Sequence, residues 1–240
     1  MIESINNERI KNYTKLNDKK YRLKENLFIA SGKHLVEEAL KKGIVKETLL
    51  LNGEENIYGK VTYVSKDILK RVSNLDNSPN VVAICYINNN DEIKGNVIIL
   101  DDIKDPGNLG TIIRSSVAFG YETIILSKES VDIYNPKVVR AAEGMLFNIN
   151  IIINELEEEI DKLKNMGYKI YGTNVNNGKN PYFEECKHAL IIGSEAHGMN
   201  KNIINKCDEN LYLKMSDNCE SLNAGVSASI LMYILSGRNL

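Results

Sequence analysis

The first residues that could do chemistry are an amide and a guanidinium that follow a predicted strand. Asn108 lies in a run of turn-forming residues, Asp105 to Asn108, and Arg114 lies in the first turn of a helix that the pattern predicts from Thr111. An amide at such a place can hold polar groups of the backbone or of a ligand, and an arginine can clamp a phosphate or a ribose oxygen with a fixed fork of donors. A surface arginine is usually only a solvated charge. Because Arg114 stands among apolar and small residues, the pattern favours a functional role for it.

A strand and a helix must hold these two side chains in place. The apolar run Val97–Leu100 predicts a buried strand, and Gly120 ends the predicted helix as a C-cap glycine would. Ligands of open α/β sheets bind at the carboxyl ends of the strands. Residues 193–198 and 215–223 also follow predicted strands, Ala189–Ile192 and Leu211–Met215. We therefore expect three loops to converge on one ligand site.

The second and third loops carry further polar groups. Gly193 and Gly198 permit close approach of the backbone to a ligand, and Glu195 supplies a carboxylate. Ser221 and Asn223 lie where the last helix, predicted over Ser221–Leu235, needs an N-cap, and capping alone would explain at least one of them. His197 is interpreted as an exposed loop histidine and is left out of the mechanism. None of these loops is a dinucleotide fingerprint or a Walker A loop, which argues against a nicotinamide dehydrogenase or a P-loop ATPase.

Strands alternate with helices along the whole chain. This alternation predicts an α/β fold, with a mostly parallel sheet covered on both faces in the second half. The polar run Asn88–Glu92 contains no large apolar group and is the best candidate for a linker. We therefore expect a small α/β domain at residues 1–92 and a second domain at 93–240.

Length, composition and net charge limit the number of domains and the kinds of binding partner. The 240 residues are 43% hydrophobic, enough for one large domain or two small ones, and the formal net charge is -2. A nucleic-acid-binding surface would therefore have to be local. The most basic stretch, Ile2–Lys24, is either a solvated helix face or an electrostatic contact for a polyanion, and both interpretations stay open.

Cysteine spacing and hydropathy favour a reduced, soluble protein without a bound metal. No two of the four cysteines form a C-x-x-C pair, and their spacing fits no zinc pattern; they are Cys85, Cys186, Cys207 and Cys219. The first residues contain no signal-peptide core, and no stretch approaches membrane-spanning length. We expect a cytoplasmic protein that does not associate with membranes.

Three ordered motifs resemble those of a known family. Residues 108–115 (NLGTIIRS), 192–198 (IGSEAHG) and 220–223 (ESLN) are similar to the three motifs of the SpoU/TrmH family, which are RNA ribose 2′-O-methyltransferases of the SPOUT class. The resemblance runs from Val97 to the C-terminus in the same order and spacing. Residues 1 to about 90 resemble the family's N-terminal RNA substrate-binding domain, an L30e-like α/β module, through Phe28–Leu40 and Val81–Ala83.

The resemblance implies a fold and an activity. The C-terminal SPOUT domain would contain a deep trefoil knot formed from about Ala189 onward, and S-adenosylmethionine would bind in a bent conformation within the knot loops. The protein would be a homodimer with each active site near the subunit interface. The implied catalytic residues are Asn108, Arg114, Glu195, Ser221 and Asn223. The implied cofactor-binding residues are Thr173, Gly193, Gly198, Leu213, Met215 and Leu222.

Two positions depart from the family pattern. Lys214 stands where the family usually has a proline before Met215, and Ser31 replaces the usual acidic residue before Gly32. The first change bears on the shape of the cofactor loop, and the second bears on RNA contacts of the N-terminal module. Neither change touches the five implied catalytic positions.

The resemblance also suggests how the reaction is promoted. A ribose hydroxyl is a poor nucleophile, whereas a sulfonium methyl group is a good electrophile, so the enzyme mainly has to orient the hydroxyl and ease its proton loss. In the family Arg114 is the residue proposed to activate the ribose. Because an arginine is almost never neutral, we expect it to act by electrostatic positioning, without a metal.

The RNA target stays open at this level. Ribosomal RNA is favoured because the N-terminal module typically accompanies the family members that act on it. The alternatives are a tRNA-directed 2′-O-methyltransferase, a resistance methyltransferase of the large-subunit RNA, and a catalytically silent RNA-binding protein that acts in ribosome assembly.

Overall fold

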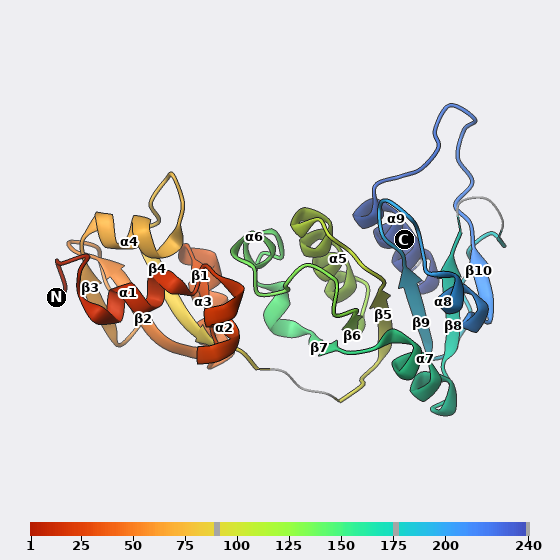
Figure 1. Cartoon of the computed structure of the whole chain (residues 1–240), viewed down its shortest axis with the longest axis horizontal. Coiled ribbons are helices and arrows are strands. Elements are labelled where there is room, and N and C mark those ends of the chain that lie inside the picture. Colours follow the sequence, from red (N-terminus) through yellow and green to blue (C-terminus); the bar gives the residue numbers. More distant parts are fainter. Residues whose placement is uncertain (89–91, 175–177, 239–240) are drawn as a thin grey trace. The chain divides into compact units, whose positions relative to one another are not determined.

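The computed structural model describes residues 1–88, 92–174 and 178–238, and Figure 1 traces the chain. Contacts divide the chain into two compact units: Met1–Asn88 with Asp132–Phe147, and Asn89–Val131 with Asn148–Leu240. Asp132–Phe147 thus packs with the first unit, although a linear boundary near residue 92 would place it in the second. Residues 89–91 of the expected linker lie outside the described residues.

The first unit is built on a four-stranded mixed sheet. Its strand order is β1-β4-β2-β3, in which β4 runs antiparallel to both neighbours and β3 runs parallel to β2. The elements are α1 (Glu8–Lys15), α2 (Lys19–Glu25), β1 (Leu27–Ser31), α3 (Lys33–Lys41), β2 (Val45–Leu51), β3 (Val61–Val64), α4 (Lys66–Ser73), β4 (Val81–Tyr86), α6 (Pro136–Ala141) and the 3-10 helix η1 (Met145–Asn148).

Different helices cover the two faces of this sheet. Ile29 of β1 packs in one cluster with residues of α1 and α4, such as Ile10 and Ile68. Successive strand residues point to opposite faces, so the preceding Phe28 points to the other face. There its ring lies 5.0 Å from the ring of Tyr134 and 5.9 Å from that of Phe147, measured between centroids. The segment 132–147 therefore forms part of the layer opposite α1 and α4.

The second unit is built on a six-stranded parallel sheet. Its order is β10-β8-β9-β5-β6-β7, and every paired strand is parallel, which confirms the predicted α/β class. The elements are β5 (Asn96–Leu100), α5 (Pro106–Ala118), β6 (Tyr121–Leu126), β7 (Asn150–Ile153), α7 (Leu156–Asn165), β8 (Lys169–Thr173), β9 (His188–Ile192), α8 (Lys201–Lys206), β10 (Glu209–Leu211) and α9 (Ala224–Leu235).

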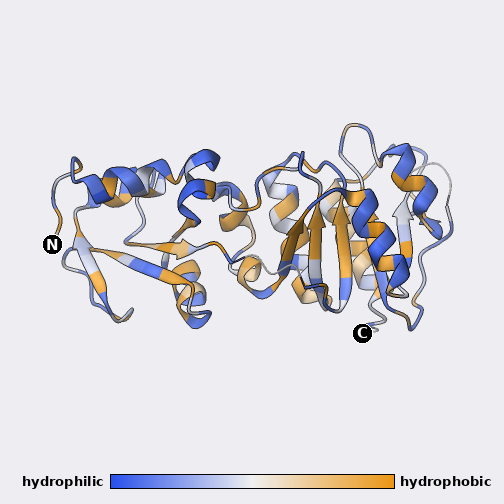
Figure 2. Ribbon diagram, turned by 60° about the horizontal axis from the view of Figure 1, so that its bottom comes forward, coloured by the Kyte–Doolittle hydropathy of each residue, from blue (hydrophilic) through white to orange (hydrophobic). Residues whose placement is uncertain are grey.

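The strands of the second unit are apolar, and their residues are buried on both faces of the sheet. Ile99 and Ile191 of the central strands are fully buried in a cluster with Ile160 of α7 and Ile203 of α8. The strands of this sheet are mainly apolar in Figure 2, whereas the helices beside it show both polar and apolar residues. This is the pattern expected of parallel strands covered by helices on both sides.

Three element boundaries differ from the predictions, and capping explains two of them. The helix predicted from Thr111 begins at Pro106, because Asp105 accepts a hydrogen bond from the backbone N–H of Asn108 and acts as the N-cap. The last helix begins at Ala224 because Asn223 is its N-cap. The last strand is Glu209–Leu211, so the predicted strand residues beyond Leu211 belong to the loop that follows.

Candidate active site

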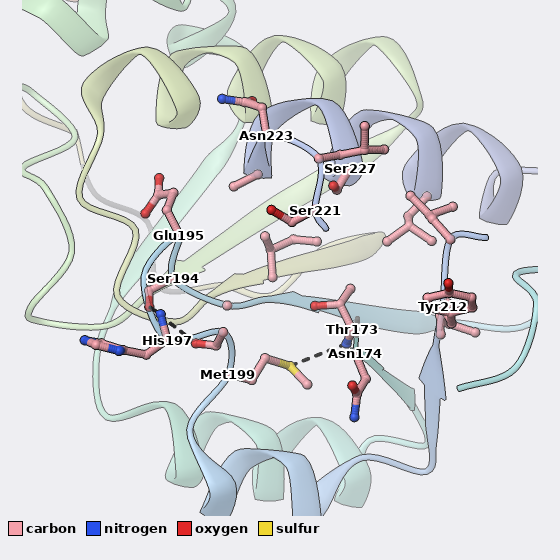
Figure 3. Close-up of a pocket in the computed structure, with 18 of the residues that line it drawn as sticks. Thr173, Asn174, Ser194, Glu195, His197, Met199, Tyr212, Ser221, Asn223 and Ser227 are labelled. Carbon is pink, nitrogen blue, oxygen red and sulfur yellow. Dashed lines mark hydrogen bonds between the residues drawn. The ribbon is translucent and has the colours of Figure 1, made fainter. Parts of the chain in front are cut away.

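A cavity of about 700 Å³ opens in the second unit at the carboxyl ends of β8, β9 and β10 (Figure 3). Thr173 ends β8, Ile192 ends β9 and Leu211 ends β10, and the loops after these strands form the walls. The lining residues are Thr173, Asn174, Ile192, Gly193, Ser194, Glu195, Ala196, His197, Gly198, Met199, Ile204, Leu211, Tyr212, Leu213, Met215, Ser221, Leu222, Asn223, Ala224, Ser227 and Leu231. Nine of these residues carry polar side chains, so the lining is mixed, with apolar and polar groups.

Asn108 links the three predicted loops through its side-chain amide. Its Nδ2 donates to Oε1 of Glu195 at 2.7 Å, and its Oδ1 accepts from Nδ2 of Asn223 at 2.7 Å. The amide group is therefore used as a donor on one side and as an acceptor on the other. Asn108 is buried and its two partners are exposed, so both bonds are partly buried, and they hold the carboxylate of Glu195 beside the start of α9.

Two helix caps orient this network. Asp105 accepts the backbone N–H of Asn108 at 2.7 Å, and Oδ1 of Asn223 accepts the backbone N–H of Val226 at 3.2 Å. The cap uses the oxygen of Asn223, which leaves its NH₂ group free to donate to Asn108. Capping was the simple interpretation of Asn223 from sequence, and the structure adds the second bond.

The loop after β9 needs glycine at its start. Ser194 and Gly198 exchange two backbone hydrogen bonds, of 3.0 and 2.9 Å, which fold the loop back on itself. A Cβ atom at Gly193 would lie 2.3 Å from the backbone carbon of Gly198 and 2.3 Å from the backbone nitrogen of Met199. No side chain fits there, so Gly193 is required for the loop to close against itself.

Two residues at strand ends form hydrogen bonds to the loops that wall the cavity. Oδ2 of Asp101, after β5, accepts the backbone N–H of Asn200 at 2.7 Å, and burial raises the pKa of this carboxyl group. Thr173 donates its hydroxyl to the carbonyl of Ile191 at 3.0 Å, and its backbone N–H lies 3.5 Å from Sδ of Met199 (Figure 3). The exits of β5 and β8 are therefore tied to the loop that follows β9.

Nine of the eleven residues implied by the resemblance line the cavity. They are Thr173, Gly193, Glu195, Gly198, Leu213, Met215, Ser221, Leu222 and Asn223. Asn108 joins them through its hydrogen bonds. Arg114 is the exception, since it is exposed on α5 and does not line the cavity among the residues that the structure describes.

The sequence interpretation missed several lining residues. His197 lines the cavity, although it was left out of the mechanism. Ser227 lies four positions after Asn223, so helical spacing could have identified it. Met199 and Tyr212 are neighbours of predicted site residues, but no pattern in the sequence distinguishes them. Leu231 looks like any other apolar residue of the last helix.

The two helices beside the cavity leave an apolar stripe exposed. The hydroxyl groups of Ser115 on α5 and Ser229 on α9 are hydrogen-bonded at 2.6 Å, so the two helices pack side by side. On α9, Val226 and Ile230 are 44% and 38% exposed, and Leu222 just before the helix is 36% exposed. Val226 and Ile230 are four positions apart on α9 and therefore share one face, and Leu222 lies in the segment just before the helix.

Neither a metal cluster nor a membrane span is found in the described part of the chain. In residues 1–88, 92–174 and 178–238, no group of three or more His, Cys, Asp or Glu side chains could hold a metal ion. No helix within these ranges is both long and apolar enough to cross a bilayer.

Two family models match the chain. The SpoU rRNA Methylase family matches residues 95–233, and the MRM3-like substrate binding domain matches residues 7–83. The first match contains all three loops of the site, and the second falls within the first unit.

Individual relatives match over nearly the whole length. The chain is 38% identical to the 23S rRNA (guanosine(2553)-2′-O)-methyltransferase RlmP of Bacillus subtilis, over 98% of this chain and 99% of that protein. It superposes on the crystal structure of an rRNA methyltransferase from Sinorhizobium meliloti with a TM-score of 0.86 and 26% identity, covering 97% of this chain and 95% of that one. The AdoMet-bound SpoU methyltransferase AviRb from Streptomyces viridochromogenes shares the fold, with a TM-score of 0.84, 24% identity and coverage of 96% and 97%.

Proposed function

We propose, because this chain belongs to the SpoU rRNA methylase family, that it transfers the methyl group of S-adenosylmethionine to a ribose 2′-hydroxyl of 23S rRNA. The observation that carries the proposal is the hydrogen-bonded set of Asn108, Glu195 and Asn223 at the wall of the cavity. Each of the three comes from a different motif of the family, and the motifs are far apart in the sequence. Their convergence on one cavity is what a shared active site requires.

The cavity suits S-adenosylmethionine in size and chemistry. Its volume of about 700 Å³ lies in the range of small-molecule sites, and apolar side chains such as Leu213 and Met215 make up much of its wall. Gly193 and Gly198 line the cavity without side chains, so the backbone of this loop can come close to a nucleoside. The cofactor would supply an electrophilic methyl group on a sulfonium centre. We therefore assign its binding to this cavity.

The residues of the chain then have to prepare the acceptor. A guanidinium beside the ribose would hold the adjacent phosphate and stabilise the oxygen as its proton leaves, in the manner of an oxyanion site. We assign this role to Arg114. The proton would leave to phosphate or water, because an arginine cannot serve as the base. Glu195, Ser221 and Asn223 would position the groups at the cavity wall.

A homodimer is part of the proposal. Arg114 does not line the cavity of its own chain, and Leu222, Val226 and Ile230 leave an apolar stripe exposed on the adjacent helix. A second copy that covers this stripe would remove apolar surface from water. It would also allow Arg114 of the partner subunit to face the cavity. Both observations support an active site at the subunit interface.

Three finer assignments follow from family membership. We propose that the chain from Ala189 onward forms the deep trefoil knot, which the position of β9 between β8 and β5 supports. We propose that residues 1–92 are an L30e-like RNA-binding domain, which the substrate-binding match to residues 7–83 supports. An enzyme that acts on ribosomal RNA would work in the cytoplasm.

Two measurements on the purified protein test the function. Calorimetric titration should give heat with S-adenosylmethionine, and incubation with unmodified 23S rRNA should produce one 2′-O-methyl group. We expect the acceptor to correspond to guanosine 2553, the nucleotide in the name of the Bacillus relative. Binding of RNA without cofactor binding would instead indicate a silent binding protein, and methylation of tRNA alone would indicate a tRNA-directed enzyme. Either result would contradict the proposal.

A further inference from the structure

Arg140 on α6 is a partly buried cation that has no partner in the part of the chain that the structure describes. Within the described residues, its guanidinium forms no hydrogen bond or ion pair, and burial lowers its pKa. The contrast with Arg22 of the same unit is clear. Arg22 is 3% exposed, forms an ion pair with Asp132 and donates to the carbonyl of Leu16 at 2.7 Å. No Arg140 nitrogen is among the fully buried polar atoms without a partner in the described residues, so its guanidinium reaches the surface and can bind an anion from outside the chain.

Further basic side chains lie on the same layer of the first unit as Arg140. Lys137 is exposed three positions earlier on α6, so the two side chains share one face, while Val138 and Val139 point into the core. The end of this segment contacts α3, where Nε2 of His34 lies 3.2 Å from the carbonyl oxygen of Glu143. The start of α3 therefore lies beside the end of the α6 segment.

Two nearby carboxylates already have a basic neighbour: Glu38, whose side chain lies beside Gly144, pairs with Lys41, and Glu37 lies near Lys33. Glu143 is exposed beside His34. Lys33 at the start of α3 is exposed and lies 3.9 Å from Glu37, at the limit of an ion pair. No acidic residue is paired with Lys137 or Arg140 in the described residues. Gly32 at the start of α3 provides no side-chain cap, which leaves the first N–H groups of that helix available to acceptors.

We propose that α6 and the start of α3 form one phosphate-binding surface for the RNA substrate, with Arg140 as its principal ligand and Lys137 and His34 beside it. The inference rests on the proposed function, because it takes RNA as the polyanion. A guanidinium matches the planar geometry of a phosphate better than an ammonium does. The surface joins segments more than 100 positions apart, so the substrate-binding match to residues 7–83 does not include its main ligand.

Binding of RNA by charge-matched variants tests this surface. The probe is an RNA hairpin that carries the 23S rRNA sequence around guanosine 2553, and affinity is measured by fluorescence anisotropy at several salt concentrations. Arg140→Gln should weaken binding at least fivefold and lower the slope of log K against log salt by about one phosphate contact. An unrelated hairpin of equal length should lose as much, because a phosphate contact reads no sequence.

Arg71 offers a matched control. It is an exposed arginine on α4, in the layer on the opposite face of the same sheet. Arg71→Gln removes the same charge and should change RNA affinity less than twofold. Equal affinities and salt slopes for Arg71→Gln and Arg140→Gln would overturn the proposal, as would a loss confined to one hairpin sequence.

Two further measurements separate folding and catalysis from RNA binding. Arg140→Lys keeps the positive charge but loses the planar guanidinium, so it should bind RNA with intermediate affinity and have the melting temperature of the wild type. If Arg140→Lys binds RNA with wild-type affinity, that result contradicts the proposal, even where Arg140→Gln fails to fold. Arg140→Gln should keep its affinity for S-adenosylmethionine. Wild-type protein that binds RNA through Arg140 but transfers no methyl group would overturn the proposed function and leave this surface intact.

Discussion

Asn223 donates a 2.7 Å hydrogen bond to Asn108, although 115 positions separate the two residues in the chain. The oxygen of the same Asn223 caps α9, and the amide nitrogen of the same Asn108 reaches Glu195. The two asparagines therefore lock the start of one helix to the start of another and to the loop after β9. This link borders the cavity, so a change in either asparagine should be felt by a bound cofactor.

Asn108→Asp should weaken both the fold and cofactor binding. The substitution replaces the donor that faces Glu195 with an oxygen, so two carboxylate groups would meet at about the present 2.7 Å contact. Losing a partly buried hydrogen bond to a charged group costs about 1–3 kcal/mol. We expect a lower melting temperature and at least tenfold weaker binding of S-adenosylmethionine by calorimetry. Thr62→Val, which removes a hydrogen bond to Glu47 in the first unit, is the control that should leave cofactor affinity unchanged.

Gly193→Ala should abolish cofactor binding. The added carbon would meet backbone atoms of Gly198 and Met199 at 2.3 Å, and backbone cannot move aside as a flexible side chain can. Gly43→Ala is the matched control, because Gly43 has φ +66 but no atom of the described residues lies within 4 Å of the added carbon. The control should cost about 1 kcal/mol of stability and leave cofactor affinity intact. Normal calorimetric binding by Gly193→Ala would show that the loop is not part of the cofactor site.

Arg114→Lys should separate catalysis from cofactor binding. Arg114 does not line the cavity of its own chain, so calorimetry should give a near-normal affinity for S-adenosylmethionine. The methyl-transfer rate should fall about 100-fold or more, because a point charge replaces the fork that holds the phosphate and stabilises the oxygen. Lys at this position with nearly full activity would rule out the proposed role.

Val226→Asp should produce a monomer without methyltransferase activity. The substitution places a charge in the exposed apolar stripe of α9, which the proposed second copy would bury. Light scattering coupled to size-exclusion chromatography measures the mass directly. Ile57→Asp is the control, since Ile57 is 56% exposed in the first unit and should tolerate the charge. A wild-type monomer, or a fully active monomeric variant, would contradict the dimeric site.

His188 should make stability depend on pH near neutrality. Its Nδ1–H donates to the carbonyl of Cys186 at 3.2 Å, so its Nε2 accepts the hydroxyl of Tyr121 at 2.7 Å, and burial lowers its pKa from the ordinary 6.5. The unfolded chain then takes up the proton first as pH falls below about 6.5, so the stability due to neutral His188 is present above that pH and is lost below it.

Thermal denaturation at pH 7.5 and 5.5 measures this effect. The melting temperature of the wild type should fall more between these values than that of His188→Gln, which cannot be protonated. His197→Gln is the control, because His197 is exposed and its loss should leave the pH dependence as in the wild type. An equal fall in the wild type and in His188→Gln would contradict the prediction.

The sequence by itself determined the α/β class and most elements of the second unit. The run Val97–Leu100 predicts β5 because four apolar residues between polar ones can be buried on both faces of a sheet, and the structure confirms that strand. Gly193 and Glu195 were identifiable for a similar reason, since a glycine and a carboxylate that directly follow a buried strand are typical of a ligand-binding loop. Such signals are local, so they can be interpreted before the chain is folded.

Only the tertiary structure decided which of these residues meet. Asn108 was expected in a loop and lies in the first turn of α5, because Asp105 caps a helix that begins at Pro106. The grouping of Asp132–Phe147 with the first unit, and the lack of a partner for Arg140 among the described residues, have no sequence signal. Burial and pairing depend on strand order and on which helix covers which face. Those are set by contacts between residues about 100 positions apart, such as Arg22 with Asp132, and not by neighbours in the chain.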